Sequence, residues 1–346
     1  MTAATLTIDL DAIRANWRAL DALSANRVET AAVVKAFGYG LDSARVAGAL
    51  ASEGTNTFFV ATVEEGARVQ AAAPGADVFV FTGLMQADVA DYLETGLIPL
   101  LNSPEQTENF LREAPDLRFG IQLDTGMNRL GLEADELLRA RALLGDATPS
   151  LVMSHLACAD EPDHPQNASQ LAEFQRLTQG WDVRRSLAAT GGTLMGAGYH
   201  FDLCRPGVGL YGGLPFAEAK PVVKVSIPTV QVRDVHLGES VGYSAAWVAT
   251  RPSRIATLAA GYADGLIRAM GKGVKVWAGD QSVPVVGRVS MDLLTVDVTD
   301  LLEVPEAFDI LGPHQSVDDL GDAAGTIGYE ILTSLGGRYK REYLGA

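Results

Sequence analysis

Short apolar runs rich in β-branched and aromatic residues alternate with amphipathic stretches between about Thr30 and Leu210. Runs of this length, without an alternating polar face, are typical of strands that are buried on both sides in a parallel sheet. Eight runs are expected to be strands, over residues 32–34, 58–60, 78–81, 97–101, 119–123, 151–153, 186–189 and 208–211. Helical periodicity predicts helices between them, including residues 43–50, 64–72, 104–112 and 170–178.

This alternation indicates the fold class of the first part of the chain. Eight β-α units in about this length favour a closed (β/α)8 barrel of the TIM type. An open, doubly wound sheet is the competing topology, because it is built from the same alternation.

The pattern changes after about Lys220. Strands are expected over residues 222–235, 255–259, 274–278, 283–286 and 293–298, with Gly, Pro and Asp between them and little helical periodicity. This predicts a mostly β C-terminal domain. We place the barrel in residues 9–220 and the β domain in residues 221–346. The N-terminal strand of residues 1–8 could pair with either domain, and we expect it to add to the β domain.

Composition and charge exclude several classes of protein. A chain with 47% hydrophobic and 20% charged residues is expected to fold, and its net charge of −16 argues against binding to nucleic acid or to an anionic membrane. We find no signal peptide and no membrane span. Cys158 and Cys204 are too few for a disulfide framework, and the histidines lack metal-ligand spacing. The expectation is a cytoplasmic protein without a metal.

A lysine stands at the carboxyl end of the first predicted strand. Active sites of barrel enzymes lie at that end, and Lys35 follows an apolar run, Ala31 to Val34. Desolvation would lower the pKa of the amine and favour its covalent reaction with a carbonyl group. A lysine that only extends into solvent from the strand end is the alternative.

Five segments resemble, in order along the chain, the motifs of bacterial-type alanine racemases, which depend on pyridoxal 5′-phosphate (PLP). They are VVKAFGYG (33–40), DTGMNRLG (124–131), RPGVGLYG (205–212), GYADG (261–265) and SMD (290–292). The resemblance implies an isomerase that interconverts L- and D-alanine, for D-alanine biosynthesis or for L-alanine catabolism. It also implies a homodimer in which the two subunits share each active site.

The resemblance assigns roles to particular residues. Lys35 would attach PLP covalently and act as one acid/base group, and Tyr243 of the partner subunit would be the other. The implied cofactor contacts come from Tyr39, His155, Thr190, Arg205, Gly207, Val208 and Tyr329. Arg205 would meet the pyridine nitrogen, and His155 would link Tyr243 to Arg205. The implied substrate contacts come from Arg129, Met291 and Tyr262.

Chemistry supports two of these assignments independently. Barrels often bind phosphate in the loops after the seventh and eighth strands, and Thr190 follows the seventh predicted strand while Gly207 adjoins the eighth. An arginine cannot give its proton to a pyridine nitrogen, because its pKa is too high. Arg205 would therefore leave the pyridine nitrogen unprotonated and weaken the electron sink, so that the carbanion is reprotonated at Cα and transamination is suppressed.

The sequence departs from the family pattern at three places. Phe37-Gly38 replaces a small or polar pair, Asp42 replaces a common glycine, and Gln122 replaces a lysine that some members carry in carbamylated form. The Gln122 amide is expected to hydrogen-bond Arg129 instead. Alternatives to an alanine racemase are a broad-specificity amino-acid racemase, a decarboxylase, which would place an acidic residue where Arg205 stands, and a non-catalytic PLP-binding protein.

Overall fold

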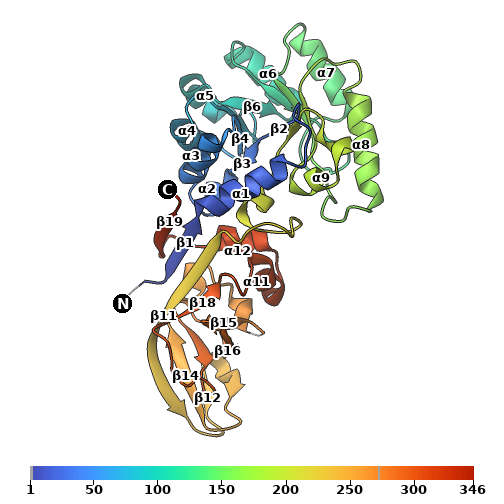
Figure 1. Ribbon diagram of the computed structural model, residues 1–346. Helices are drawn as coiled ribbons and strands as arrows, with labels where there is room; N and C mark the ends of the chain where they lie inside the picture. The colour runs from blue at the N-terminus through green and yellow to red at the C-terminus, as the bar shows by residue number, and fades with distance from the viewer. Residues whose placement is uncertain (1–2, 272) are drawn as a thin grey trace. The chain divides into compact units, whose positions relative to one another are not determined.

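The computed structural model describes residues 3–271 and 273–346, which form two compact units (Figure 1). One unit comprises residues 14–210 and 215–218. The other comprises the described residues up to 13, residues 211–214 and the described part of 219–346. Each unit has its own sheet, and the two are described in turn.

The first unit is a parallel barrel. Seven strands pair in chain order: β3 (Ala32–Val33), β4 (Thr57–Val60), β5 (Asp77–Val80), β6 (Ile98–Leu101), β7 (Gly120–Gln122), β8 (Leu151–Met153) and β9 (Arg185–Ser186). The eighth, β10 (Leu203–Cys204), pairs in parallel with β2 (Glu29–Thr30), directly before β3. The Arg205 N–H donates to the Ala188 carbonyl at 2.8 Å and joins β10 to the β9 side. The predicted barrel is confirmed.

The eighth strand is not where the apolar pattern placed it. Residues 208–211 form a 3-10 helix, η2 (Val208–Tyr211), in which the Leu210 N–H donates to the Gly207 carbonyl at 2.8 Å. A four-residue apolar run does not distinguish a strand from a buried helical turn by its periodicity. The true eighth strand lies a few residues earlier, so Gly207 follows it rather than beginning it.

Helices cover the outside of the barrel strands (Figure 1). The outer layer contains α3 (Ser43–Glu53), α4 (Val63–Ala72), α5 (Val89–Thr95), α6 (Pro104–Glu113), α7 (Ala134–Leu144) and α8 (Pro165–Leu177). Helix α1 (Leu10–Asp21) precedes the barrel, and the short α9 (Thr190–Leu194) and α10 (Ala197–His200) lie between β9 and β10. Four predicted helices correspond to α3, α4, α6 and α8. In the barrel, the Phe59 ring stacks on those of Phe79 and Phe81, with centroids 5.2 and 5.4 Å apart.

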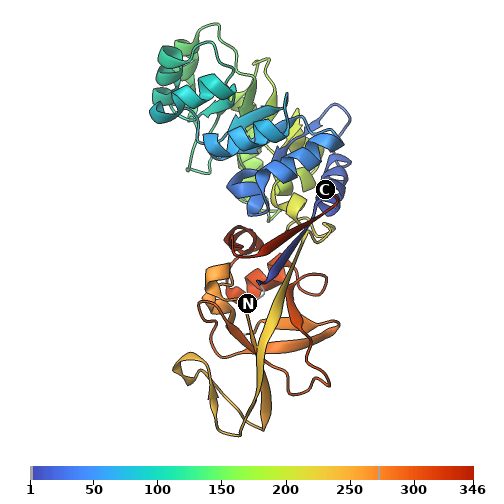
Figure 2. The same ribbon diagram turned by 90° about the vertical axis from the view of Figure 1, so that its left-hand side faces the viewer.

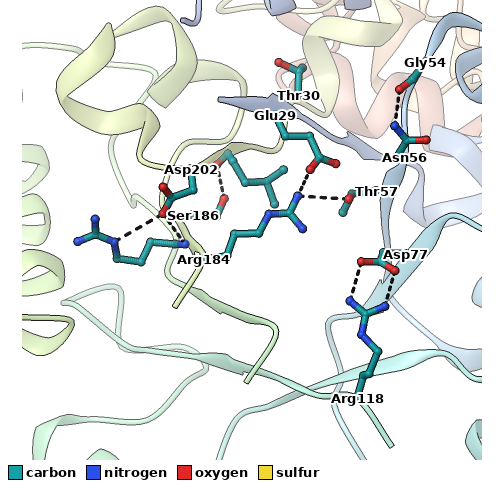
Figure 3. Close-up of polar contacts among 12 residues, drawn as sticks. Glu29, Thr30, Gly54, Asn56, Thr57, Asp77, Arg118, Arg184, Ser186 and Asp202 are labelled. Atoms are coloured by element: carbon teal, nitrogen blue, oxygen red, sulfur yellow. Dashed lines mark hydrogen bonds and ion pairs between the residues drawn. The ribbon is translucent and has the colours of Figure 1, made fainter. Parts of the chain in front are cut away.

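Ion pairs join the amino ends of the barrel strands (Figure 3). Arg118, just before β7, makes a bidentate pair with Asp77 at the start of β5, with N–O distances of 2.6 and 2.8 Å. Arg184, just before β9, pairs with Glu29 of β2 and also contacts Thr57 of β4. In (β/α)8 barrels this end carries residues that stabilise the fold, whereas the chemistry lies at the carboxyl end.

The second unit is built on an eight-stranded sheet in the order β14-β17-β16-β15-β18-β11-β1-β19. The strands are β1 (Thr5–Asp9), β11 (Val223–Val235), β14 (Ser253–Leu258), β15 (Lys275–Ala278), β16 (Gln281–Val286), β17 (Leu294–Asp297), β18 (Ala307–Leu311) and β19 (Lys340–Leu344). Because β14 also pairs with β11, the sheet closes into a β-barrel. The predicted β domain is confirmed.

The long strand β11 organises this unit, and Figure 2 shows its full length. Its first half pairs with β1 and β18, and its second half pairs with β14. Strand β1 therefore lies between β11 and β19, antiparallel to the first and parallel to the second. Two helices that the sequence pattern did not predict, α11 (Val317–Ala324) and α12 (Gly328–Ser334), follow β18.

None of the helices in the described residues is long and apolar enough to cross a membrane.

Candidate active site

A left-handed turn carries the candidate catalytic lysine. Lys35 begins α2 (Lys35–Tyr39) directly after β3, and each residue from Ala36 to Gly40 has a positive φ, between 52° and 83°. Left-handed backbone costs roughly 1–2 kcal/mol for each residue that has a side chain, and Ala36, Phe37 and Tyr39 are three such residues. This strain must be offset by contacts elsewhere, and backbone strain of this kind is found at functional sites.

Burial of Lys35 lowers the pKa of its amine. Desolvation is the main cause, the positive charge of Arg129 acts in the same direction, and the carboxylate of Glu65 opposes both. Although Lys35 as a residue remains exposed to solvent, its amine lies 5.6 Å from the centroid of the Phe81 ring. A larger fraction of this lysine is therefore neutral than of a solvated one, as covalent reaction with a carbonyl compound requires.

A completely buried arginine lies on the neighbouring strands. Arg205 follows β10 and is 1% exposed. Its guanidinium donates to the Ser186 hydroxyl and, at 2.7 Å, to the Ser154 carbonyl. Desolvation lowers its pKa to about 10, so it remains a charged donor at neutral pH. These contacts fix the plane of the guanidinium at the end of β8, β9 and β10.

His155 lies beside Arg205 and is held in its neutral form. Desolvation, followed by the charges of Arg205, Arg129 and Lys35, lowers the pKa of His155 to about 3. Its carbonyl accepts a hydrogen bond from Gln170 of α8 at 2.9 Å. Residues 35, 129, 155 and 205 thus act on one another at the carboxyl end of the barrel, as expected from the sequence for a site there. A neutral imidazole can both donate and accept, which suits a hydrogen-bonding link between other groups.

Thr190 joins the loops after the seventh and eighth strands. Its hydroxyl oxygen accepts from the Gly207 and Gly209 N–H groups, at 3.0 and 3.3 Å. A hydroxyl oxygen has two acceptor positions and one proton. With both positions occupied, the Thr190 hydroxyl can still donate its own proton to an acceptor. A Cβ on Gly207 would lie 2.4 Å from the Tyr39 hydroxyl oxygen, so only glycine permits this approach. Two hydroxyl donors thus meet at a glycine, and the arrangement suits a phosphate group.

Arg129 is presented by a compact loop after β7. The Asp124 carboxylate accepts N–H groups from Gly126, Met127 and Arg129, at 2.7 to 3.1 Å. The Arg129 side chain is exposed, and its charge reaches both Lys35 and His155. It can therefore receive the carboxylate of a small substrate. The resemblance assigned this role to Arg129 but none to Asp124, which holds the loop.

The departures from the family pattern have local explanations. The Gln122 amide donates to the Leu130 carbonyl at 3.2 Å, so its hydrogen bond goes to the backbone of this loop and not to the Arg129 side chain as expected. Asp42 has φ +79°, where glycine would be unstrained, but its carboxylate caps α3 by accepting from Ala44 and Arg45. The N–H of Phe37 donates to Glu65.

Of the five remaining candidate residues, Val208 is buried at the start of η2 in the barrel unit, and the other four lie in the second unit. Tyr243 is 69% exposed in η3 (Tyr243–Ala245), so its hydroxyl is accessible. Tyr262, which begins η4 (Tyr262–Asp264), and Met291 are brought together, because the Ala263 N–H donates to the Met291 carbonyl at 2.9 Å. Gly261 makes this possible, since a Cβ there would lie 2.3 Å from the Ser290 carbonyl oxygen. Tyr329 lies in the first turn of α12.

A parallel barrel with a desolvated lysine, a buried arginine and a hydroxyl-lined glycine turn at its carboxyl end has the architecture of the PLP-dependent barrel enzymes. Residues 8–215 match the model of the alanine racemase N-terminal domain, and residues 222–343 match that of the alanine racemase C-terminal domain. The chain belongs to the alanine racemase family and is an isomerase.

Similar proteins cover the whole chain. The alanine racemase of Dinoroseobacter shibae is 60% identical, over 100% of this chain and 99% of that protein. The crystal structure of alanine racemase from Bartonella henselae with covalently bound pyridoxal phosphate is 38% identical with a TM-score of 0.94, over 99% of this chain and 100% of that chain. The biosynthetic alanine racemase of Pseudomonas aeruginosa is 36% identical with a TM-score of 0.92, over 99% of each chain.

Proposed function

We propose that this chain interconverts L- and D-alanine with PLP held by the barrel domain, residues 9–220. We further propose that Tyr243, in the domain of residues 221–346, reaches the site of a second subunit, so that a homodimer shares its two active sites. The observation that carries the proposal is the position of Lys35 at the carboxyl end of the first barrel strand, on a left-handed turn, in a chain that belongs to the alanine racemase family.

The residues divide the work of cofactor binding between them. PLP, when bound, withdraws electrons from the substrate and makes its Cα–H acidic. Arg205, fixed by Ser154 and Ser186, donates a hydrogen bond to the pyridine nitrogen and keeps its own proton. The phosphate is held by Tyr39, Thr190, Gly207, Val208 and Tyr329. The Thr190 oxygen accepts two backbone N–H groups, so its hydroxyl proton remains for donation to a phosphate oxygen.

Racemisation requires proton transfer on both faces of the substrate Cα. Lys35 takes or gives the proton on one face, and the Tyr243 hydroxyl does so on the other. His155, as a neutral imidazole, links Tyr243 of the partner subunit to Arg205. Arg129 and the Met291 backbone hold the substrate carboxylate, and Tyr262 narrows the entrance.

The reaction can serve either direction of metabolism. It supplies D-alanine for peptidoglycan or L-alanine for catabolism, according to which enantiomer the cell consumes. Cys158 and Cys204 are both unpaired, which fits a reducing compartment, and we place the protein in the cytoplasm.

Covalent attachment tests the lysine. After incubation with PLP and reduction with borohydride, mass spectrometry should find the adduct on Lys35. Lys35→Ala should lose the adduct together with racemisation of alanine, because no other amine in the barrel site is desolvated in this way. Lys275→Ala, which removes an exposed lysine of β15, should lose neither. An adduct that persists in Lys35→Ala would contradict the assignment, and equal rates with several amino acids would contradict alanine specificity.

Subunit mixing tests the shared site. Lys35→Ala and Tyr243→Ala chains, each nearly inactive alone, are co-expressed with different tags. In a mixed dimer one site carries both lesions, and the other combines an intact Lys35 with an intact Tyr243. Random pairing makes about half of the dimers mixed, with one good site in two, so activity should recover to roughly a quarter of wild type. No recovery in purified mixed dimers would show that both groups come from one chain.

A further inference from the structure

Helix α4 contacts the left-handed turn that carries Lys35 and Tyr39. The contacts come from its first two turns and end on Phe37, at the centre of the turn. Neither the sequence motifs nor the roles proposed above give α4 any part in the site. The inference below rests on the proposed function, since it concerns how Lys35 and Tyr39 are placed for PLP.

The carboxylate of Glu65 bridges the turn and the neighbouring strand. One oxygen accepts the Phe37 N–H at 3.2 Å, and the other accepts the Ala61 N–H, directly after β4, at 2.9 Å. Strands β3 and β4 are already joined there, because the Val34 N–H donates to the Phe59 carbonyl at 2.9 Å. Glu65 therefore ties the strained backbone to a rigid part of the barrel with two charge-assisted hydrogen bonds.

A second contact from the same helix reaches the side chain of Phe37, which is half-exposed. The Arg68 guanidinium carbon lies 4.8 Å from the centroid of the Phe37 ring, one turn after Glu65. Gly38 lets the turn pack tightly, since a Cβ there would lie 3.0 Å from the Ser43 backbone. Phe37-Gly38 departs from the family pattern, and these contacts show how this chain accommodates the pair.

Glu65 also provides the negative charge that acts on Lys35. The charged and titratable groups that face the amine are Glu65 from α4, Arg129 from the loop after β7, and His155 from the loop after β8. Of these, Glu65 alone favours the protonated amine. The Glu65 carboxylate thus has two effects. It holds the turn in place, and it limits the lowering of the Lys35 pKa.

We propose that Glu65 is a positioning residue, whose bridge between Phe37 and Ala61 sets the left-handed turn so that the Lys35 amine and the Tyr39 hydroxyl are both directed at the cofactor. It contacts neither PLP nor substrate and acts through the turn.

Two substitutions separate the bridge from the charge. Glu65→Gln keeps the length of the side chain, but it loses the charge and presents an NH2 group to one of the two N–H donors. Glu65→Asp keeps the charge and is one methylene too short to reach both donors. Glu64→Gln is the matched control, because Glu64 lies in the same first turn of α4, is exposed, and loses the same charge.

Two measurements on the full chain give the readouts. The affinity for PLP is titrated by absorbance in PLP-free protein, and the pKa of Lys35 is measured by competitive acetylation across pH with mass spectrometry, the exposed lysines being internal references. We expect Glu65→Gln to bind PLP about tenfold more weakly, which corresponds to ~1.4 kcal/mol, and to titrate Lys35 at lower pH. Glu65→Asp should also bind PLP more weakly, with a smaller shift of the Lys35 pKa.

The outcomes are distinct. Glu65→Gln and Glu65→Asp indistinguishable from Glu64→Gln in both readouts would overturn the proposal. So would wild-type PLP affinity in Glu65→Asp, because charge alone would then suffice without the bridge. Circular dichroism verifies that each variant is folded, and if Glu65→Gln fails to fold, Glu65→Asp decides the question. If wild-type protein does not attach PLP to Lys35, the proposed function fails instead.

Discussion

At the scale of single residues, burial sets the charge of the barrel site. Desolvation is the largest influence on Lys35, His155 and Arg205, and it lowers the pKa of all three. The charge that results depends on the ordinary pKa of each side chain. Histidine becomes neutral over the whole physiological range, lysine moves toward neutrality, and arginine stays charged because its pKa of about 10 is still high. Desolvation of three different groups thus yields one hydrogen-bond link, one nucleophile and one permanent donor.

The titration of His155 predicts how acid affects stability. Its pKa is about 3 in the folded chain and about 6.5 when unfolded, so between these values only the unfolded chain binds the proton. The free energy of unfolding should therefore fall as pH falls from 6.5 toward 3. His155→Gln lacks this contribution and should show a flatter decline, measured by urea unfolding at pH 7 and pH 4.5. The exposed His236→Gln variant should decline like wild type, and a His155→Gln decline parallel to wild type would refute the argument.

At the scale of elements, the strands were more predictable than the turns. The apolar runs from 32–34 to 151–153 are strands because their residues are buried on both faces of the barrel. The strand predicted at residues 208–211 was wrong, because a short apolar segment can be buried equally well as a helical turn. The left-handed turn at 36–40 was not predictable, since Ala, Phe and Tyr do not favour positive φ. Contacts with Glu65 and Gly207, distant in sequence, accompany this conformation.

The candidate site was predictable to different degrees for related reasons. The strand-end position of Lys35 favoured its role independently, whereas the usual phosphate loops of a barrel only agreed with the roles that the resemblance gave Thr190 and Gly207. The roles of Tyr243, Tyr262, Met291 and Tyr329 came from the resemblance alone. Glu65 and Gln170 were missed, because each lies on an outer helix and acts by hydrogen-bonding backbone groups of another element. No local pattern marks such a residue.

The hydrogen bonds by which Thr190 joins two loops predict that its hydroxyl contributes both to stability and to binding of the phosphate group of PLP. Thr190→Val keeps the shape but leaves the buried N–H groups of Gly207 and Gly209 without their acceptor. The free energy of unfolding should fall by roughly 1–3 kcal/mol, and PLP should bind more weakly while pyridoxal, which lacks the phosphate, is less affected. Thr190→Ser keeps the hydroxyl and is the control. Wild-type stability in Thr190→Val, measured by urea unfolding, would show that the two N–H groups find another acceptor.

At the scale of the whole molecule, the two units use the chain differently. Barrel strands β3 to β9 pair with their neighbours in sequence, and β10 pairs in parallel with β2, directly before β3. The second unit is made from both ends of the chain, because Thr5 of β1 pairs with Ser226 of β11 and with Lys340 of β19. Insertion of the barrel between β1 and β11 separates these partners in sequence without separating them in the sheet.

The insertion of the barrel between β1 and β11 determines the order in which the paired strands of the second unit are translated. The barrel unit is complete in sequence by Glu218, so it can begin to fold while the rest of the chain is still being translated. Strand β1 leaves the ribosome before the barrel, yet its antiparallel partner, Val223–Val235, appears only after the barrel, and its parallel partner, Lys340–Leu344, appears later still. For most of translation Thr5–Asp9 is therefore an unpaired strand edge, with alternate side chains destined for burial, and such edges associate with other chains. Both strands that pair with it are made only after the whole barrel.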